Sequence, residues 1–279
     1  MQSNITSGET AYIFTKKILG KYDVKYYKCL QTGYIQTEEP YWLAEAYASA
    51  ITKLDVGLVA RNQLVSPIAQ RLIYTYFNSD GRFLDYAGGY GLFTRLMRDK
   101  GYNFYNTDKY CQNIFAEFHD LALLSDHAEF EMITSFEVME HLANPYPTLD
   151  EMFSHSSSIF FTTEILPTHV NTIDSWWYLS VETGQHVGLY TTDALAYMAK
   201  QYDKYFYTDG KWLHLFTNKK IDTNPFAYLT TKVEEPYLIK KIRRMLKRFE
   251  QKNNMIFEGN KTSLIDNDWL DAKKRITKA

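Results

Sequence analysis

Glycines and an acid are concentrated in residues 85–91, which read Asp-Tyr-Ala-Gly-Gly-Tyr-Gly. A short apolar run ends at 84, and a helical pattern of apolar residues follows over 92–100. Glycines at a strand-to-helix turn permit a sharp bend and let a ligand approach the main chain. The first turn of the helix offers free N–H groups, which favour a carboxylate or a phosphate. The segment predicts a binding loop for a polar ligand, and a plain tight turn is the alternative.

A second acid, Asp108, follows the next apolar run at 104–105. A carboxylate at the end of the strand beside a glycine-rich loop commonly accepts the ribose hydroxyls of a nucleoside. A solvated acid at a strand end is the alternative. Together, the loop and Asp108 predict an adenosine-containing ligand.

Two carboxylates and an imidazole, those of Glu137, Glu140 and His141, follow a third apolar run at 132–136. In an open α/β sheet, ligands lie beyond the carboxyl ends of the strands, so we expect these side chains at the mouth of a site. Acids that favour the dipole of a helix N-terminus are the alternative.

The elements that must position these residues alternate between apolar runs and helical patterns over 80–218, which indicates βα units around a parallel sheet. The Asp209-Gly210 pair between two β-rich runs predicts a terminal antiparallel hairpin. We expect this segment to be the core domain.

The segments on either side of the core are expected to be accessory. Residues 1–79 predict a hairpin that turns at Gly33, then a helix over 40–54 and a second one ending near 77, as a cap over the ligand. Residues 219–279 are more charged, and a basic amphipathic helix over 238–251 predicts a C-terminal helical extension.

The composition of the 279-residue chain excludes several classes of protein. A formal net charge of −2 gives no electrostatic footprint for nucleic acid. Two cysteines, Cys29 and Cys111, do not suffice for a disulfide scaffold. The sequence has neither an apolar run of about 18 residues nor a signal peptide, so we expect a cytoplasmic protein without an integral membrane segment. A homodimer is compatible with these features.

The three motifs resemble those of class I S-adenosylmethionine-dependent methyltransferases. Residues 85–91 match the family's D-x-G-x-G-x-G loop, with Ala87 where the first glycine is usual. Alanine fits there if the position needs little positive φ. Asp108 matches the ribose-binding acid, and FEVMEHL, at 136–142, is similar to the E-V-x-E-H-L segment of the ubiquinone-biosynthesis-like branch. PYWLAEAYASAI, DVGLVARN and ETGQHVGLY resemble segments of bacterial methyltransferases found with surface-polysaccharide genes.

This resemblance implies an α/β, Rossmann-like fold. Its sheet would have seven mostly parallel strands in the order 3-2-1-4-5-7-6, with the antiparallel terminal hairpin and the N-terminal helical cap. It also implies S-adenosylmethionine as the cofactor and S-adenosylhomocysteine as its product. The residues that would bind the cofactor are Asp85, Ala87, Gly88, Gly89, Gly91, Asp108, Asp120, Phe136 and Glu137.

No metal is expected from the resemblance. Some sugar methyltransferases carry an N-terminal cysteine-rich zinc knuckle, but Cys29 is followed by Thr32 where a second cysteine would stand.

A hydroxyl acceptor is a poor nucleophile and needs a general base or a metal. We expect His186 to be the base or a substrate ligand, with His141 and Glu137 as further catalytic candidates. Rings and polar groups near His186 are expected to bind the substrate, and they belong to Trp176, Trp177, Tyr178, Glu182 and Gln185.

The expected reaction is methyl transfer to a sugar or nucleotide-sugar hydroxyl by in-line displacement, with histidine-assisted deprotonation of a small-molecule or glycan acceptor. Two alternatives stay open. One is a catalytically silent methyltransferase-like partner of a glycosyltransferase. The other is an NAD-dependent oxidoreductase, whose loop would read G-x-G-x-x-G.

Overall fold

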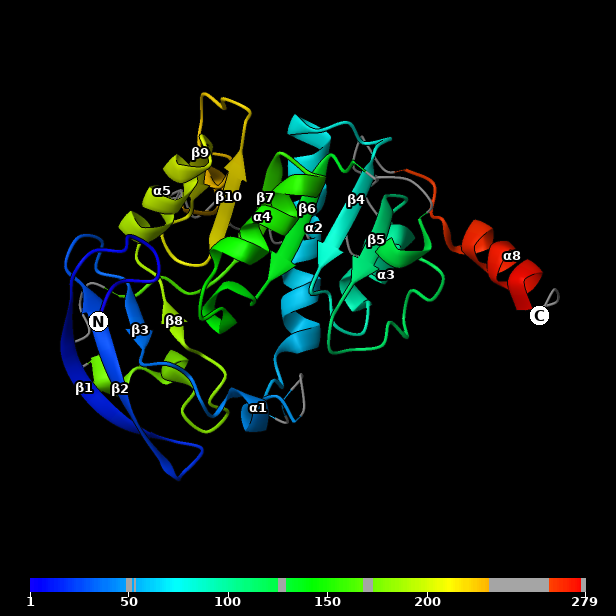
Figure 1. Ribbon diagram of the computed structural model, residues 1–279. Coiled ribbons are helices and arrows are strands. Elements are labelled where there is room, and N and C mark those ends of the chain that lie inside the picture. Colours follow the sequence, from blue (N-terminus) through cyan, green and yellow to red (C-terminus); the bar gives the residue numbers. More distant parts are fainter. Residues whose placement is uncertain (49–51, 53, 125–128, 168–172, 231–260, 277–279) are drawn as a thin grey trace, which may run out of the picture.

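The computed structural model describes residues 1–48, 52, 54–124, 129–167, 173–230 and 261–276. They form two sheets: six strands in the order β5-β4-β6-β7-β10-β9, and four in the order β1-β2-β3-β8. Figure 1 shows the smaller sheet at one end of the molecule and the C-terminal helix at the opposite end.

The larger sheet is mixed. Its strands are β4 (Arg82–Tyr86), β5 (Asn103–Thr107), β6 (Met132–Phe136), β7 (Ser158–Thr162), β9 (Tyr205–Thr208) and β10 (Leu213–Thr217). Strands β5, β4, β6 and β7 are parallel, whereas β10 is antiparallel to both β7 and β9. The predicted terminal hairpin at Asp209-Gly210 is therefore confirmed.

The predicted third strand of the seven is not formed within the described residues. Beyond β5 there is a single parallel bridge, between Asn106 and Asp120. The preceding chain instead makes a turn that the Asn113 side chain holds by two hydrogen bonds to Ala116, and residues 121–123 form a 3-10 helix. The order 3-2-1-4-5-7-6 is thus observed without its first member.

Helices cover both faces of this sheet. On one face, α2 (Leu58–Tyr76) and α3 (Leu92–Asp99) pack on one buried cluster, while α4 (Tyr146–His155) and α5 (Thr192–Gln201) pack on another across the sheet. Successive strand residues alternate between the clusters: Phe83 faces α2 and α3, and Leu84 faces α4 and α5. This alternation follows from the two-residue period of a strand.

A smaller sheet includes the N-terminal segment, where the sequence predicted a single hairpin ahead of two helices. Its strands are β1 (Thr10–Ile18), β2 (Tyr22–Cys29), β3 (Ile35–Thr37) and β8 (Gly188–Leu189). The predicted hairpin turn at Gly33 joins β2 to β3, with a φ of +72° at the glycine. Of the helix expected over 40–54, the structure describes α1 (Leu43–Ala46), and 49–51 and 53 lie outside the described residues. The predicted helix ending near 77 is observed as α2, whereas strand β1 was not predicted.

Strand β8 links the two sheets. It belongs to the chain after β7 but pairs with β3 of the N-terminal segment. The predicted domain boundary at 79/80 thus separates residues that share one sheet. The same pairing fixes the position of the chain just after His186.

The C-terminal segment includes α6 (Ala227–Thr230) and α8 (Ile265–Ile276). Asp268 of α8 receives hydrogen bonds from Arg98 of α3 at 2.6 and 2.8 Å, which holds α8 against the core. The basic helix expected over 238–251 lies outside the described residues. Within the described residues, none of the helices combines the length and apolar character needed to cross a bilayer.

Candidate active site

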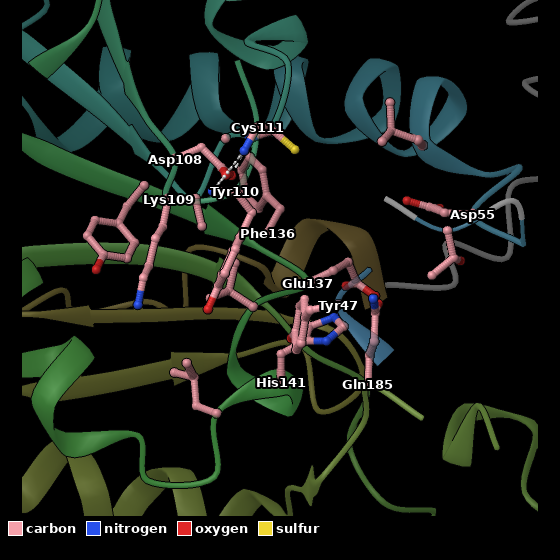
Figure 2. A pocket seen from close by; sticks show the side chains of 18 of the residues that line it. Tyr47, Asp55, Asp108, Lys109, Tyr110, Cys111, Phe136, Glu137, His141 and Gln185 are labelled. Atoms are coloured by element: carbon pink, nitrogen blue, oxygen red, sulfur yellow. Dashed lines mark hydrogen bonds between the residues drawn. The ribbon is translucent and has the colours of Figure 1, made fainter. Parts of the chain in front are cut away.

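A crevice of ≈ 1070 Å³ opens at the carboxyl ends of β4, β5 and β6. Small-molecule sites commonly measure about 300–1,000 Å³, so this one has room for a cofactor and an acceptor together. Figure 2 shows Asp108 and Tyr110 on one side and Glu137, His141 and Gln185 on another, with Phe136 between them. The crevice therefore has a part near the glycine loop and a part near the histidines.

The glycine loop turns through three left-handed residues, Ala87 (φ +56°), Gly89 (φ +56°) and Gly91 (φ +80°). The condition under which alanine fits this position, a φ that is little positive, is therefore not met. A left-handed conformation costs an L-residue about 1–2 kcal/mol, so this loop carries local strain. Ala87 and Gly89 line the crevice, whereas Gly91 does not. A Cβ at Gly91 would lie 2.1 Å from Asn113 Oδ1, so this glycine is required for packing rather than for ligand contact.

Gly88 makes the closest approach in the loop. A Cβ there would lie 2.1 Å from Asn106 Oδ1 and 2.3 Å from Asp85 Oδ2, so no larger residue fits without movement of the loop. The bare backbone of Gly88 and Gly89 thus forms a cradle above two buried polar side chains. Such a cradle fits the methionine end of S-adenosylmethionine, which needs close main-chain contact.

Asp85 lies beneath this cradle and is 2% exposed. Thr134 donates a hydrogen bond of 2.8 Å to its Oδ1. Burial raises the pKa of the Asp85 carboxyl to about 7, and the nearby charge of Asp108 contributes in the same direction. A cationic ligand above the loop would favour the charged form of Asp85.

Asp108 is held by backbone groups on both of its oxygens. Oδ2 accepts from Gly89 N–H at 2.9 Å, while Oδ1 accepts from the N–H groups of Tyr110 and Cys111 at 2.7 Å each. A carboxylate has about four acceptor positions, so one remains, on Oδ2. Asp108 also lines the crevice. It therefore ties the glycine loop to the turn after β5 and keeps one acceptor for a ligand hydroxyl.

Asp120 does not line the crevice. Its Oδ1 accepts from Asn113 Nδ2 at 3.0 Å. The prediction that it contacts adenine fails because the chain after Asp108 turns back, leaving Asp120 in the bridge beside Asn106.

Glu137 directly follows β6 with a φ of +54°, and its carboxylate is surrounded by donors. Oε1 accepts from Trp212 Nε1 at 2.7 Å and from Thr162 Oγ1 at 2.8 Å. The Tyr178 hydroxyl donates to Oε2 at 3.3 Å. Glu137 lines the crevice, but these bonds make it a fixed acceptor rather than a free base.

His186 and His141 face each other at the floor of the crevice. Their ring centroids are 4.8 Å apart with an interplanar angle of 88°. His186 Nδ1 lies 2.6 Å from the Tyr178 carbonyl oxygen, and because a carbonyl only accepts, this nitrogen carries the proton. The lone pair of His186 is therefore on Nε2. Burial lowers the pKa of both imidazoles, that of His141 to about 3, so both are neutral at pH 7.

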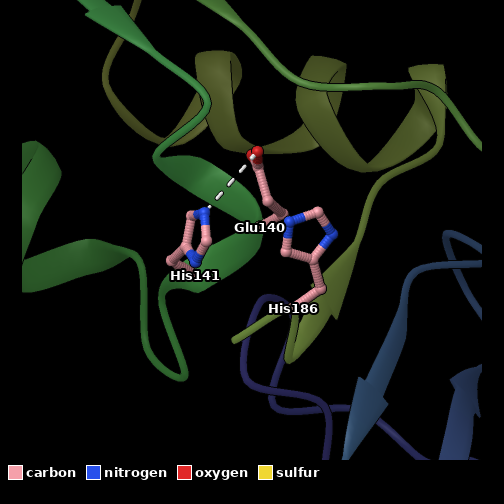
Figure 3. A group of neighbouring side chains, drawn as sticks. All are labelled: Glu140, His141 and His186. Carbon is pink, nitrogen blue, oxygen red and sulfur yellow. Dashed lines mark ion pairs between the residues drawn. The ribbon is translucent and has the colours of Figure 1, made fainter. Parts of the chain in front are cut away.

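Glu140 lies behind the two histidines and is fully buried. Figure 3 shows it with His141 and His186, and its Oε1 is 4.0 Å from His141 Nε2. Burial raises the pKa of Glu140, and repulsion from Glu137 adds to this effect. The backbone of Glu140 accepts a hydrogen bond from Val187 N–H at 2.8 Å, which joins this segment to the strand after His186.

The part of the crevice near the histidines, called the acceptor part below, contains some of the residues predicted to bind substrate. Trp177, Tyr178 and Gln185 line it, and Trp177 is 73% exposed. Trp176 and Glu182 do not line it. Trp176 packs instead in the cluster below the smaller sheet, 5.2 Å from the Tyr178 ring. Of these two tryptophans, Trp177 is the one that lines the crevice.

Several residues that line the crevice were not among the predicted site residues. Tyr47 and Tyr110 stack at 5.2 Å across the crevice wall, joining the α1 segment to the turn after β5. Arg61 of α2 pairs with Asp55 at 2.8 Å on the same wall. The DVGLVARN segment, which contains both Asp55 and Arg61, was the available signal.

The fold and the crevice define a class: a Rossmann-like domain that binds a nucleoside cofactor at the carboxyl ends of its parallel strands. Residues 60–203, just over half of the chain, match the family described as methyltransferase domain. The chain belongs to this family. This match confirms the predicted methyltransferase class of the domain.

Solved structures of methyltransferases resemble the chain at low identity. OxaC in complex with SAH and oxaline is 17% identical, with a TM-score of 0.40 and coverage of 55% of this chain and 46% of OxaC. Magnesium protoporphyrin IX methyltransferase (ChlM) from Synechocystis PCC 6803 with bound SAH is 12% identical, with a TM-score of 0.44 and coverage of 63% and 93%. An O-methyltransferase family 2 protein from Planctomyces limnophilus DSM 3776, in complex with apigenin, is 15% identical, with a TM-score of 0.42 and coverage of 63% and 65%.

The chain spans under half the length of both ligand-bound OxaC structures, 46% and 43%. No curated protein matches the chain.

Proposed function

We propose that the chain transfers a methyl group from S-adenosylmethionine to a hydroxyl of a small molecule, a sugar or nucleotide sugar being the acceptor class. The observation that carries this proposal is the fixed tautomer of His186. Its Nδ1–H donates to the Tyr178 carbonyl, which leaves Nε2 as a free acceptor in the crevice.

The cofactor part of the crevice assigns roles to residues of this chain. The backbone of Gly88 and Gly89 would hold the methionine moiety, Asp85 would balance its positive charge, and Asp108 would accept a ribose hydroxyl. When bound, the cofactor supplies an electrophilic methyl group on its sulfonium. Phe136 lies between the two parts of the crevice and would exclude water from the line of transfer.

In the part of the crevice near the histidines, the neutral His186 can take the hydroxyl proton on Nε2 while the oxygen bonds to the methyl carbon. The bond from that carbon to sulfur would break at the same time, leaving S-adenosylhomocysteine. The imidazolium that forms is close to the Glu137 carboxylate, which favours it electrostatically. His141 forms the floor, and Trp177 presents an exposed ring on which a sugar face can stack. The proposal also includes a cytoplasmic location, a role in polysaccharide synthesis, a homodimer and a glycan as an alternative acceptor.

A methylation assay tests it. Labelled S-adenosylmethionine is incubated with nucleotide sugars, free sugars and phenolic compounds, and the products are identified by mass spectrometry. We expect transfer to a sugar hydroxyl, with His186→Gln at least a hundredfold slower and His155→Ala, whose histidine is on α4 outside the crevice, at the rate of the native chain.

Calorimetry separates binding from transfer. His186→Gln should bind S-adenosylmethionine as tightly as the native chain does. Full turnover in His186→Gln would refute the role of this histidine, and binding of NAD in place of S-adenosylmethionine would refute the proposal as a whole.

A further inference from the structure

The side chains of Glu140, His141 and His186 form a cluster whose potential ligand atoms, one per residue, all lie within 4.8 Å of one another. Figure 3 shows the carboxylate and the two imidazoles converging on a common space. Two atoms bound to one cation at about 2.1 Å are separated by about 3–3.5 Å, so the cluster closes on a cation by movements of about an ångström or less.

Glu140 provides an independent observation. It is 0% exposed, and within the described residues neither of its carboxylate oxygens makes a hydrogen bond of ordinary geometry, although the hydroxyls of Tyr178 and Thr163 lie near enough to favour its charged form. Burying a carboxylate without compensation is costly, and Glu137 adds a second negative charge nearby. A bound cation would satisfy both oxygens and balance this charge.

The two histidines differ in what surrounds their nitrogen atoms. The Nδ1–H of His186 donates to the Tyr178 carbonyl, the arrangement by which a backbone carbonyl commonly orients a metal-binding imidazole. His141 Nδ1 is buried and has no hydrogen-bond partner within the described residues, and its Nε2 faces Glu140. Both rings also border the crevice, so an entry path exists.

We propose that Glu140, His141 and His186 bind a divalent cation at the floor of the acceptor part of the crevice. Two imidazoles and one carboxylate favour Zn²⁺, Mn²⁺, Fe²⁺ or Co²⁺ over Mg²⁺. We do not include Glu137 among the ligands, because Trp212, Thr162 and Tyr178 already donate to three of its about four acceptor positions. Three protein ligands leave positions open for water and for an acceptor oxygen.

A bound cation would change how the acceptor hydroxyl loses its proton, because His186 would no longer be free to take it. This consequence alone rests on the proposed function. With the lone pair of His186 donated to the cation, the cation would lower the pKa of a bound acceptor hydroxyl, which would lose its proton to water. The oxygen's electron pair would then form the bond to the methyl carbon while the bond from that carbon to sulfur breaks, and S-adenosylhomocysteine would leave with the electron pair of that bond. No oxidant or reductant is needed.

Metal binding is tested on the full chain without any methyl transfer, so its failure is distinct from failure of the proposed function. Chelator-treated protein is dialysed against Co²⁺ or Mn²⁺, and bound metal is measured by elemental analysis and by Co²⁺ absorption. We expect one cation per chain, with at least tenfold weaker binding in both Glu140→Gln and His186→Gln. His155→Ala, a histidine outside the cluster, should bind like the native chain.

Two outcomes would overturn the proposal: no cation retained by the native chain, or equal retention by the native chain and both variants. Thermal unfolding and S-adenosylmethionine binding confirm that each variant is folded. If Glu140→Gln fails to fold, His186→Gln, which alters a crevice-lining residue, decides the question.

Discussion

Asp108→Asn tests cofactor binding with the least expected effect on folding. The new side chain keeps one oxygen, which can still accept from the N–H groups of Tyr110 and Cys111. Its amide nitrogen replaces Oδ2, so a donor then faces Gly89 N–H and the position of the ribose hydroxyl. One charge-assisted bond to the cofactor is lost, worth about 1.5–3 kcal/mol. Affinity for S-adenosylhomocysteine should fall between about tenfold and about 150-fold.

The assay is isothermal titration, with thermal unfolding as a measure of the fold. Asp209→Asn is the matched control, because Asp209 Oδ1 accepts three backbone N–H groups at 2.8–2.9 Å in the terminal hairpin, outside the crevice. We expect native affinity in that variant. Affinity within twofold of the native value in Asp108→Asn would refute the assignment of a cofactor hydroxyl to Asp108.

Three further predictions concern the glycine loop. Gly88→Ala should abolish detectable cofactor binding and lower the free energy of unfolding by about 1–3 kcal/mol, because the added Cβ overlaps Asn106 and Asp85. The control is Gly8→Ala, whose Cβ would lie no closer than 3.1 Å to its neighbours. Native cofactor binding by Gly88→Ala would contradict the role of the glycine backbone as a cradle. Affinity for S-adenosylmethionine should fall by about tenfold from pH 8 to pH 6. The pKa of Asp85 is about 7, so its carboxylate, which would face the positively charged cofactor, is neutralised over this range. Titrations that show no change, or tighter binding at pH 6, would count against this role. Ala87→Gly should raise the free energy of unfolding by about 0.5–1 kcal/mol by relieving the left-handed alanine, and a lower melting temperature would argue against strain at this position.

The core of the fold was predictable because each of its strands is short, apolar and followed by a polar signal. The four parallel strands and the Asp209-Gly210 hairpin were identified from such patterns. The third strand was not a safe prediction, because one residue of pairing at Asp120 leaves no periodic pattern. Strand β8 was missed for a similar reason: a two-residue strand gains its partner from β3, far away in sequence.

The cofactor part of the site was more predictable than the acceptor part. Asp85, Gly88 and Asp108 lie within motifs whose spacing follows from a strand, a turn and a helix. The neighbourhood of His186 and Glu140 depends on long-range packing between the segments after β6 and β7. The sequence could list these two residues, but it could not show that Glu140 is fully buried and that neither of its oxygens has a hydrogen bond of ordinary geometry among the described residues.

The central claim is that the crevice between the glycine loop and Asp108 holds the methyl donor. A crystal structure of the chain with S-adenosylhomocysteine tests it most directly. We predict electron density over Gly88 and Gly89, with a ribose hydroxyl within hydrogen-bond distance of Asp108 Oδ2. An empty crevice at saturating ligand, or a ligand bound with Asp108 turned away from it, would contradict the account.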